Sequence, residues 1–300
     1  MEGFVGVVVE TIPEFVVIGH VTRDLHADGS TSIGGTAAFA ALAAQRLGLR
    51  AGVVTCAAPD LLADLAKVLM GVMVVAQPSR ASTVFEHIYQ DGRRYQYLRA
   101  RAEDIKSELV PSAWKAASVV LLGPVAQEVD PLIASFFPQS LRGATPQGWL
   151  RRWDETGLVS PARWTQAAVA LPHLHVLVLS REDIAWHDEA VVAAAEDSDT
   201  LEQWRAQVSI LVVTDGANGA FVYHEGKIEH FPAFHAVERD PTGAGDVFAA
   251  AFLIHLARSG DVAAAATFAN CMASFVVEQA GVSGIPDGAQ IAQRLREQRP

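Results

Sequence analysis

The most informative stretch of this sequence is DPTGAGD, residues 240–246, which Val247, Phe248 and a further apolar run follow. The three small residues before Asp246 leave consecutive backbone N–H groups unobstructed at the start of a predicted helix. That helix start carries about half a positive charge. The stretch therefore predicts an anion hole for phosphate oxygens, formed by Gly243, Ala244 and Gly245. Asp246 stands beside it and is the candidate base that accepts a proton from an attacking alcohol.

Two other phosphate-binding motifs are absent from the sequence. No GxxxxGK[ST] occurs, which excludes a P-loop. The pair Gly243 and Gly245 lacks the third glycine of a dinucleotide fingerprint and lies far from the first strand. The anion hole therefore indicates a different class of phosphate-handling protein.

The composition of the chain argues against several kinds of partner and site. The 300 residues are 50% hydrophobic, and 23 Lys and Arg against 34 Asp and Glu give a formal net charge of −11. An acidic chain of this kind argues against nucleic acid or an anionic membrane as the main partner. Cys56 and Cys271 give neither a disulfide framework nor zinc-ligand spacing. Without a long apolar run or a basic N-terminal region, the sequence favours a cytoplasmic protein.

Strand and helix signals alternate along the chain. An apolar run at 15–18 precedes an Ala-rich helical segment at 36–47 and a second strand at 51–55. Continuous apolar runs, typical of strands buried on both faces of a parallel sheet, recur at 118–122, 176–179 and 210–213. Two Ala-rich helices are predicted at 247–257 and 263–277. The pattern predicts one α/β domain over residues 1–300 with a mostly parallel central sheet.

Residues 82–100 interrupt this pattern. They are rich in β-branched and aromatic residues around Asp91-Gly92, which predicts a β-hairpin. We expect it to form a small β-lid inserted at about 82–101. Tyr95 and Tyr97 on one face fit either a homodimer contact through the lid or a flap that packs on its own ligand.

A second unusual segment spans residues 138–165. It contains three tryptophans and four arginines: Trp149, Trp153, Trp164, Arg142, Arg151, Arg152 and Arg163. Two interpretations remain open for it. One is an amphipathic surface insertion, and the other is a loop on the substrate side of the site.

Taken together, these motifs resemble the ribokinase-like, or PfkB, carbohydrate kinases. Residues 240–248 look like the C-terminal signature of that family, and GHVTRD at 19–24 is similar to the end of its first strand. The pair at 34–35 resembles its paired-glycine motif. VTDGANG at 213–219 resembles its nucleotide-binding turn. The resemblance covers most of the chain and implies a three-layer ribokinase-like α/β sandwich.

The resemblance also implies residue roles. Asp246 would be the catalytic base beside the anion hole. Acceptor binding would fall to Asp24, Gly34, Gly35, Thr22 and Thr36, and ATP binding to Thr214, Gly216, Gly219 and Asn270. Asp240 and Thr242 would frame a potassium-type site. Mg²⁺ would arrive with ATP, held mainly by phosphates and water, with Asp183 acting on it only indirectly.

Three departures from the family pattern bear on the acceptor and the metal. Thr22 stands where the family commonly has Asn, and Thr36 where Asn or Lys commonly follows the glycine pair. The family's NxxE motif appears as SRED at 180–183. Residues 123–124 and TPQGWL at 145–150 resemble the inositol-kinase-like branch, which favours a polyol acceptor.

The sequence leaves three functions to be compared. The first is an ATP-dependent kinase acting on a hydroxyl of a sugar or inositol-like polyol. The second is a nucleoside kinase with the same machinery, in which Phe39 and Phe85 would line an aromatic acceptor pocket. The third, of another class, is a regulator that binds sugar or nucleotide but has lost turnover, as the altered SRED motif would allow.

Overall fold

The computed structural model describes residues 11–90, 93–185 and 196–297. Its centre is a nine-stranded sheet in the order β15-β14-β13-β12-β9-β8-β1-β4-β5, in which only the β13–β14 and β14–β15 pairs are antiparallel. The strands are β1 (Phe15–Ile18), β4 (Ala51–Ala57), β5 (Met73–Pro78), β8 (Val119–Leu122), β9 (Leu141–Ala144), β12 (Val176–Ser180), β13 (Ile210–Thr214), β14 (Ala220–His224) and β15 (Lys227–Phe231). Continuous apolar runs form the central strands because helical layers cover both faces of the sheet. The predicted parallel α/β sheet is confirmed.

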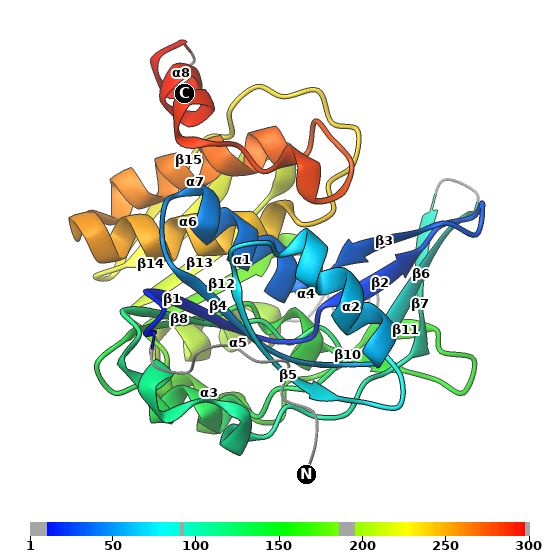
Figure 1. Ribbon diagram of the computed structural model, residues 1–300. Helices are drawn as coiled ribbons and strands as arrows, with labels where there is room; N and C mark the ends of the chain where they lie inside the picture. The colour runs from blue at the N-terminus through cyan, green and yellow to red at the C-terminus, as the bar shows by residue number, and fades with distance from the viewer. Residues whose placement is uncertain (1–10, 91–92, 186–195, 298–300) are drawn as a thin grey trace.

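Helices cover both faces of this sheet (Figure 1). One face carries α1 (Thr36–Arg46), α2 (Pro59–Val68), α6 (Ala244–Ser259), α7 (Val262–Val276) and α8 (Gly288–Glu297). The other face is covered by α3 (Ala167–Ala170), α5 (Glu196–Arg205) and several 3₁₀ turns. The 3₁₀ turns of the chain span Ser107–Leu109, Ser112–Ala116, Pro131–Phe136, Pro146–Leu150, Leu171–His173, Gly216–Asn218 and Gly281–Gly284. The short α4 (Arg181–Ala185) follows β12 directly.

A second sheet of four strands projects from one side of the core (Figure 1). Its order is β3-β2-β6-β7, with β2 (Thr22–Leu25), β3 (Thr31–Gly34), β6 (Thr83–Gln90) and β7 (Arg93–Ala100). The antiparallel β6–β7 pair is the predicted hairpin, although the Asp91-Gly92 turn lies outside the described residues. Residues 22–34, which read as a polar stretch in the sequence, supply the other two strands, and β2 pairs with β6 in parallel. We call this sheet the lid.

The segment 138–165 is not a surface insertion. Its first part is β9, a central strand of the nine-stranded sheet, and Trp149 and Trp164 stack in the core with ring centroids 4.9 Å apart. Its second part is a small hairpin of β10 (Arg151–Trp153) and β11 (Val159–Pro161), which meets lid strand β7 through a hydrogen bond from the Leu98 N–H to the Gly157 carbonyl (2.8 Å). The segment therefore joins the core to the lid.

The described residues contain no membrane-spanning helix and no disulfide bond between the two cysteines. Within residues 11–90, 93–185 and 196–297, no helix has both the length and the apolar character needed to cross a bilayer. Cys56 and Cys271 are both buried and unbonded to each other.

Candidate active site

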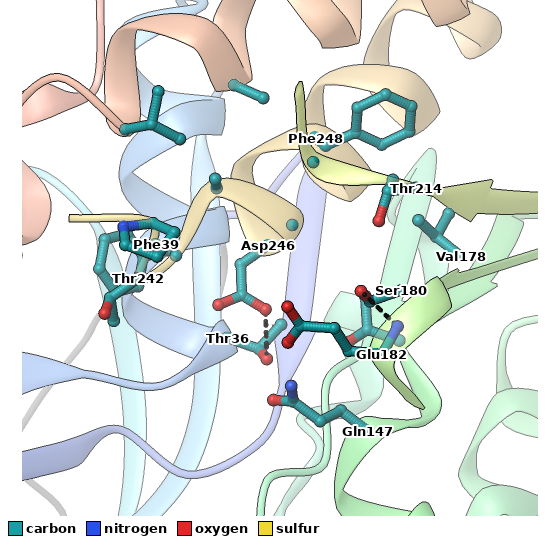
Figure 2. Close-up of a pocket in the computed structure, with 18 of the residues that line it drawn as sticks. Thr36, Phe39, Gln147, Val178, Ser180, Glu182, Thr214, Thr242, Asp246 and Phe248 are labelled. Carbon is teal, nitrogen blue, oxygen red and sulfur yellow. Dashed lines mark hydrogen bonds between the residues drawn. The ribbon is translucent and has the colours of Figure 1, made fainter. Parts of the chain in front are cut away.

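A cavity of about 610 Å³ lies between the lid and the carboxyl ends of the parallel strands. Ser180 and Thr214 line it from the ends of β12 and β13, while Phe85 and Gln96 line it from the lid. Asp246 lines it from the start of α6 (Figure 2). This is the edge at which open α/β sheets keep their ligand crevices.

Asp246 is the third residue of α6, which begins at Ala244. One of its carboxylate oxygens, Oδ1, accepts a hydrogen bond from the Thr36 hydroxyl at 2.7 Å. Burial raises the pKa of Asp246 to about 6, from an ordinary value of 3.8, and the Thr36 hydrogen bond and the Arg151 guanidinium oppose that rise. The carboxylate is therefore ionised at neutral pH and basic enough to accept a proton.

The predicted anion hole is the turn that begins α6. Gly243 caps the helix in the left-handed region (φ +83°), and a Cβ there would lie 2.3 Å from the Phe39 ring. Gly243, Ala244 and Gly245 all line the cavity. No atom lies within 4 Å of the position that a Cβ on Gly245 would take, so this glycine leaves open space at the helix start. The turn has the shape and the dipole to hold a phosphate.

Four of the five residues predicted to bind the acceptor line one wall of the cavity: Thr22, Asp24, Gly35 and Thr36. Thr22 donates its hydroxyl to Asp24 Oδ1 at 3.2 Å, and both side chains are buried. Gly34, on the neighbouring strand, does not line the cavity itself. A Cβ on Gly34 would lie 2.2 Å from Asp24 Oδ2, so this glycine makes room for the carboxylate. Gly35 has φ +85° and passes close to the His20 carbonyl.

The residues predicted to bind ATP also line the cavity. The Thr214 hydroxyl donates a hydrogen bond to the Leu179 carbonyl at 3.4 Å. Gly216 also lines the cavity, and a Cβ on it would enter open space. Gly219 has φ +90° and lies against the Phe231 carbonyl. A Cβ on Gly219 would lie 2.1 Å from that carbonyl oxygen. The Asn270 amide donates to that same carbonyl at 2.9 Å. Gly219 and Asn270 therefore hold the segment after β15 against the cavity.

The altered SRED motif places two acidic residues near Asp246. The Asp183 carboxylate accepts a hydrogen bond from the Ser180 N–H at 3.0 Å, and burial raises the pKa of Asp183. Glu182 is exposed, and its carboxylate faces the Asp246 side of the cavity (Figure 2). In the described part of the chain, no three His, Cys, Asp or Glu side chains gather closely enough to hold a metal ion. A magnesium ion bound here would therefore need oxygens from phosphates and water.

The two residues predicted to frame a potassium-type site are adjacent but differ in exposure to the cavity. Asp240 Oδ1 accepts the Thr242 N–H at 3.0 Å, and the Asp240 N–H donates to the Val277 carbonyl at 3.1 Å. Thr242 lines the cavity, whereas Asp240 does not. The Asp240 carboxylate is held against the loop that precedes α6.

Several lining residues had no role assigned from the sequence. They include Gln147, Arg151, Glu182, His87 and Gln96. The guanidinium of Arg151 lies 5.8 Å from the centre of the Phe85 ring and close enough to lower the pKa of Asp246. The only sequence signals for Gln147 and Arg151 were the Trp- and Arg-rich segment and the TPQGWL run. The hairpin was predicted as a lid and Phe85 as a candidate pocket residue, but nothing local marked His87 or Gln96 as part of the site.

Comparison with known proteins agrees with this geometry. The family model described as pfkB family carbohydrate kinase matches residues 14–287. The chain belongs to the pfkB carbohydrate kinase family. It is thus a phosphotransferase with a hydroxyl group as acceptor, as the sequence predicted.

Relatives within the pfkB family differ in substrate. A probable fructokinase-5 of Arabidopsis thaliana is 24% identical over 74% of this chain and 72% of its own length. A nucleoside kinase of Methanocaldococcus jannaschii is 32% identical over 33% of each chain. An inositol 3-kinase of Zea mays is 34% identical over 33% of this chain and 26% of its own length. The shorter matches span about a third or less of those pfkB relatives.

Solved structures share the fold at low identity. A pyrophosphate-dependent kinase in the ribokinase family, complexed with a pyrophosphate analog and myo-inositol, has a TM-score of 0.75 at 20% identity, covering 93% of this chain and 99% of that one. Arabidopsis thaliana ribokinase complexed with ribose and ATP has a TM-score of 0.72 at 19% identity, covering 95% and 99%. The pfkB chain therefore has the ribokinase-like fold.

Proposed function

We propose that this chain transfers the γ-phosphoryl group of ATP to a hydroxyl of a small polyol, with an inositol-like ring as the favoured acceptor. The observation that carries the proposal is the position of Asp246. Its carboxylate lies at the start of α6, directly after the glycine turn, and in the same cavity as the polar wall around Asp24. A base and a phosphate cradle that share one cavity with hydroxyl-binding groups are the parts phosphoryl transfer needs.

Each part has a separate task in this reaction. Asp246 takes the proton of the acceptor hydroxyl as the oxygen attacks phosphorus. The N–H groups of residues 243–245, at the positive end of α6, stabilise the charge on the transferring phosphoryl oxygens. The lid covers the cavity opposite α6 through Phe85, His87 and Gln96 and limits the access of water.

The acceptor side of the cavity favours a polyol over a nucleoside. Asp24, Gln147 and Arg151 line it with carboxylate, amide and guanidinium groups, which suit several hydroxyls. Neither candidate aromatic residue offers a free face, because Phe39 is 1% exposed and packs on Gly243, while Phe85 is 4% exposed beneath Arg151. Neither Phe39 nor Phe85 therefore offers an open ring on which a nucleobase could stack.

The part of the cavity around Thr214, where the phosphate donor would bind, has a lining that suits a nucleotide. Apolar side chains of Val178, Phe248, Ala273 and Val277 line the cavity around Thr214, which provides a surface for an adenine ring. A family structure from E. coli contains ATP and Mg²⁺, while a neighbour of similar fold is pyrophosphate-dependent. The open cradle at Gly245 fits a magnesium-bound phosphate chain, and the metal would neutralise charge on its oxygens.

Two other predictions belong to the same proposal. Asp240 and Thr242 would hold a potassium-type ion beside the anion hole, and turnover would then rise when K⁺ replaces a bulky organic cation.

A homodimer through the lid would cover Tyr95, which is 36% exposed. Sedimentation of the protein with and without ligands tests the dimer.

The nucleoside kinase remains the second candidate, because a nucleoside kinase is among the relatives that match a third of the chain. The regulator without turnover is the third. The presence of Asp246 in the cavity, with a raised pKa and a free approach past Gly245, argues against that loss.

The test is ADP release from Mg-ATP in the presence of K⁺ across a panel of sugars, inositols and nucleosides. A parallel set with pyrophosphate, read as orthophosphate release, separates the two donors. Strong turnover on an inositol or related polyol is the expected result. Turnover confined to nucleosides would replace the proposed acceptor, and a silent panel with intact ATP binding by thermal shift would favour the regulator.

A further inference from the structure

The catalytic carboxylate is held by a residue that the sequence had assigned to the acceptor. The Thr36 hydroxyl donates to Asp246 Oδ1 at 2.7 Å, joining residues 210 positions apart (Figure 2). An ionised carboxylate only accepts hydrogen bonds, so the hydroxyl proton must point at Asp246. Its single proton is then not free to bind the acceptor.

The packing around Thr36 fixes this direction. Thr36 is the first residue of α1, directly after the left-handed Gly35, and is 1% exposed. A Cβ on Gly123 would lie 2.4 Å from the Thr36 methyl group, so this glycine provides the space that the methyl group fills. Because a β-branched side chain has few χ1 choices, a seated methyl also fixes the hydroxyl.

The start of α1 also packs against the start of α6, the helix that carries Asp246. Phe39 of α1 packs against Gly243, the residue that caps α6. The N-termini of α1 and α6 therefore both lie beside the same carboxylate. Each adds partial positive charge there, which favours the ionised form.

We propose that Thr36 is a positioning residue for the base, which engages Oδ1 so that Oδ2 is left to receive the proton of the acceptor hydroxyl. This inference rests on the proposed kinase function. In that step, the acceptor oxygen loses its proton to Oδ2 and forms a bond to the γ-phosphorus. The bond from that phosphorus to the bridging oxygen breaks, and ADP leaves with the electron pair.

The charged groups around Asp246 determine what loss of the hydroxyl would do. Burial raises the pKa of Asp246, and the carboxylates of Asp183 and Asp24 raise it further. The Thr36 hydrogen bond and the Arg151 guanidinium lower it. Glu182 faces the same side of the cavity (Figure 2). Removing the Thr36 hydroxyl leaves Arg151 as the main opposing group, so the pKa of Asp246 rises.

The experiment compares Thr36→Val, which keeps the shape and removes the donor, with Thr36→Ser, which keeps the donor. The pH dependence of kcat/KM is measured for both, with the acceptor and ATP that the panel identifies. For Thr36→Val we expect the acidic limb to move up by about one pH unit, which lowers the ionised fraction of Asp246 near pH 7 about twofold, and kcat there to fall about tenfold because the orientation of Oδ2 is also lost. The KM for the acceptor should stay within about twofold, since the acceptor does not use this hydroxyl. Thr36→Ser should keep the wild-type acidic limb.

A second measurement does not depend on turnover. The Asp246 carboxyl carbon is titrated by ¹³C NMR in the ligand-free protein, with Asp246→Asn identifying the signal. A higher midpoint in Thr36→Val than in wild type supports the contact even if no acceptor in the panel is phosphorylated, in which case only the proposed function fails. An unchanged midpoint, or a raised acceptor KM with an unshifted pH profile, would overturn the inference and return Thr36 to the acceptor site.

Discussion

At the scale of single residues, Asp246 is a carboxylate whose ionisation is costly. Burial places its pKa at about 6, while the unfolded chain would titrate near the ordinary 3.8. In the proposed mechanism the reaction uses this basicity, and the Thr36 hydroxyl and the Arg151 guanidinium favour the ionised form. The burial that makes Asp246 a stronger base therefore also makes its ionised form costly to the stability of the fold.

Asp246→Asn is expected to lower kcat by ~10²–10⁴-fold, because an amide cannot accept the acceptor's proton. Binding of ATP and acceptor should persist, since the glycine turn and the acceptor wall are untouched. Steady-state kinetics and ligand-induced thermal shifts measure the two effects. Near-normal turnover in this variant would exclude Asp246 as the base.

The same substitution makes a prediction about stability. The folded state binds the Asp246 proton more tightly than the unfolded state, so ionisation destabilises the fold as pH rises from about 4 to about 6. Asp246→Asn removes this cost, and its stability relative to wild type should increase between pH 5 and pH 8 by on the order of 1 kcal/mol. Urea unfolding at the two pH values measures this. A variant that is relatively less stable at pH 8 than at pH 5 would contradict the raised pKa.

At the scale of elements, the two glycines at the start of α6 have different surroundings. Gly243 is left-handed and touches Phe39, whereas Gly245 is helical and faces open space. The two positions lie two residues apart, but a methyl group has different consequences at each.

Gly243→Ala is expected to destabilise the protein by about 1–3 kcal/mol, from backbone strain and the clash with Phe39. Gly245→Ala should leave the melting temperature equal or higher, since alanine favours the helix. Its added methyl group enters the phosphate cradle, so KM for the donor should rise. Thermal melts and donor titrations of the pair measure this contrast. Equal melting temperatures, or an unchanged donor KM in Gly245→Ala, would show that the turn is not used in this way.

At the scale of the whole molecule, the cavity lies between the lid and the nine-stranded sheet, and the β10–β11 hairpin contacts lid strand β7. The lid contributes Phe85, His87 and Gln96, and the core contributes the glycine turn. Arg23, on the face of β2 opposite Asp24, reaches Asp60 and Asp64 of α2 at 3.1 and 2.8 Å. That contact ties the lid to the core behind the acceptor wall.

Acceptor binding should therefore slow backbone hydrogen exchange in the lid strands as well as at the start of α6. ATP alone should protect residues near Thr214 and Asn270 more than the lid. Hydrogen–deuterium exchange with mass spectrometry, with each ligand separately, measures both patterns. Protection by the acceptor that leaves 83–90 and 93–100 unchanged would remove the lid from the acceptor site.

The class of fold and the backbone geometry at the start of α6 were predictable from local sequence. Apolar runs predicted β1, β8, β12 and β13 closely, because a strand buried on both faces has no polar alternation. DPTGAGD predicted a tight turn into a helix because its glycines act through the local backbone: the left-handed Gly243 and the helix start follow from neighbouring residues alone. Features of this kind need no distant partner.

Only the tertiary structure decided how the rest of the site is assembled. The parallel pairing of β2 with β6 brings the segment near residue 24 beside the β-branched and aromatic segment near residue 85, and no local pattern encodes that register. β9 places the Trp-rich segment in the core and carries Gln147 and Arg151 into the cavity. The Thr36–Asp246 hydrogen bond likewise depends on α1 packing beside α6. These contacts join segments separated by tens to hundreds of residues, so the packing of the whole chain determines them.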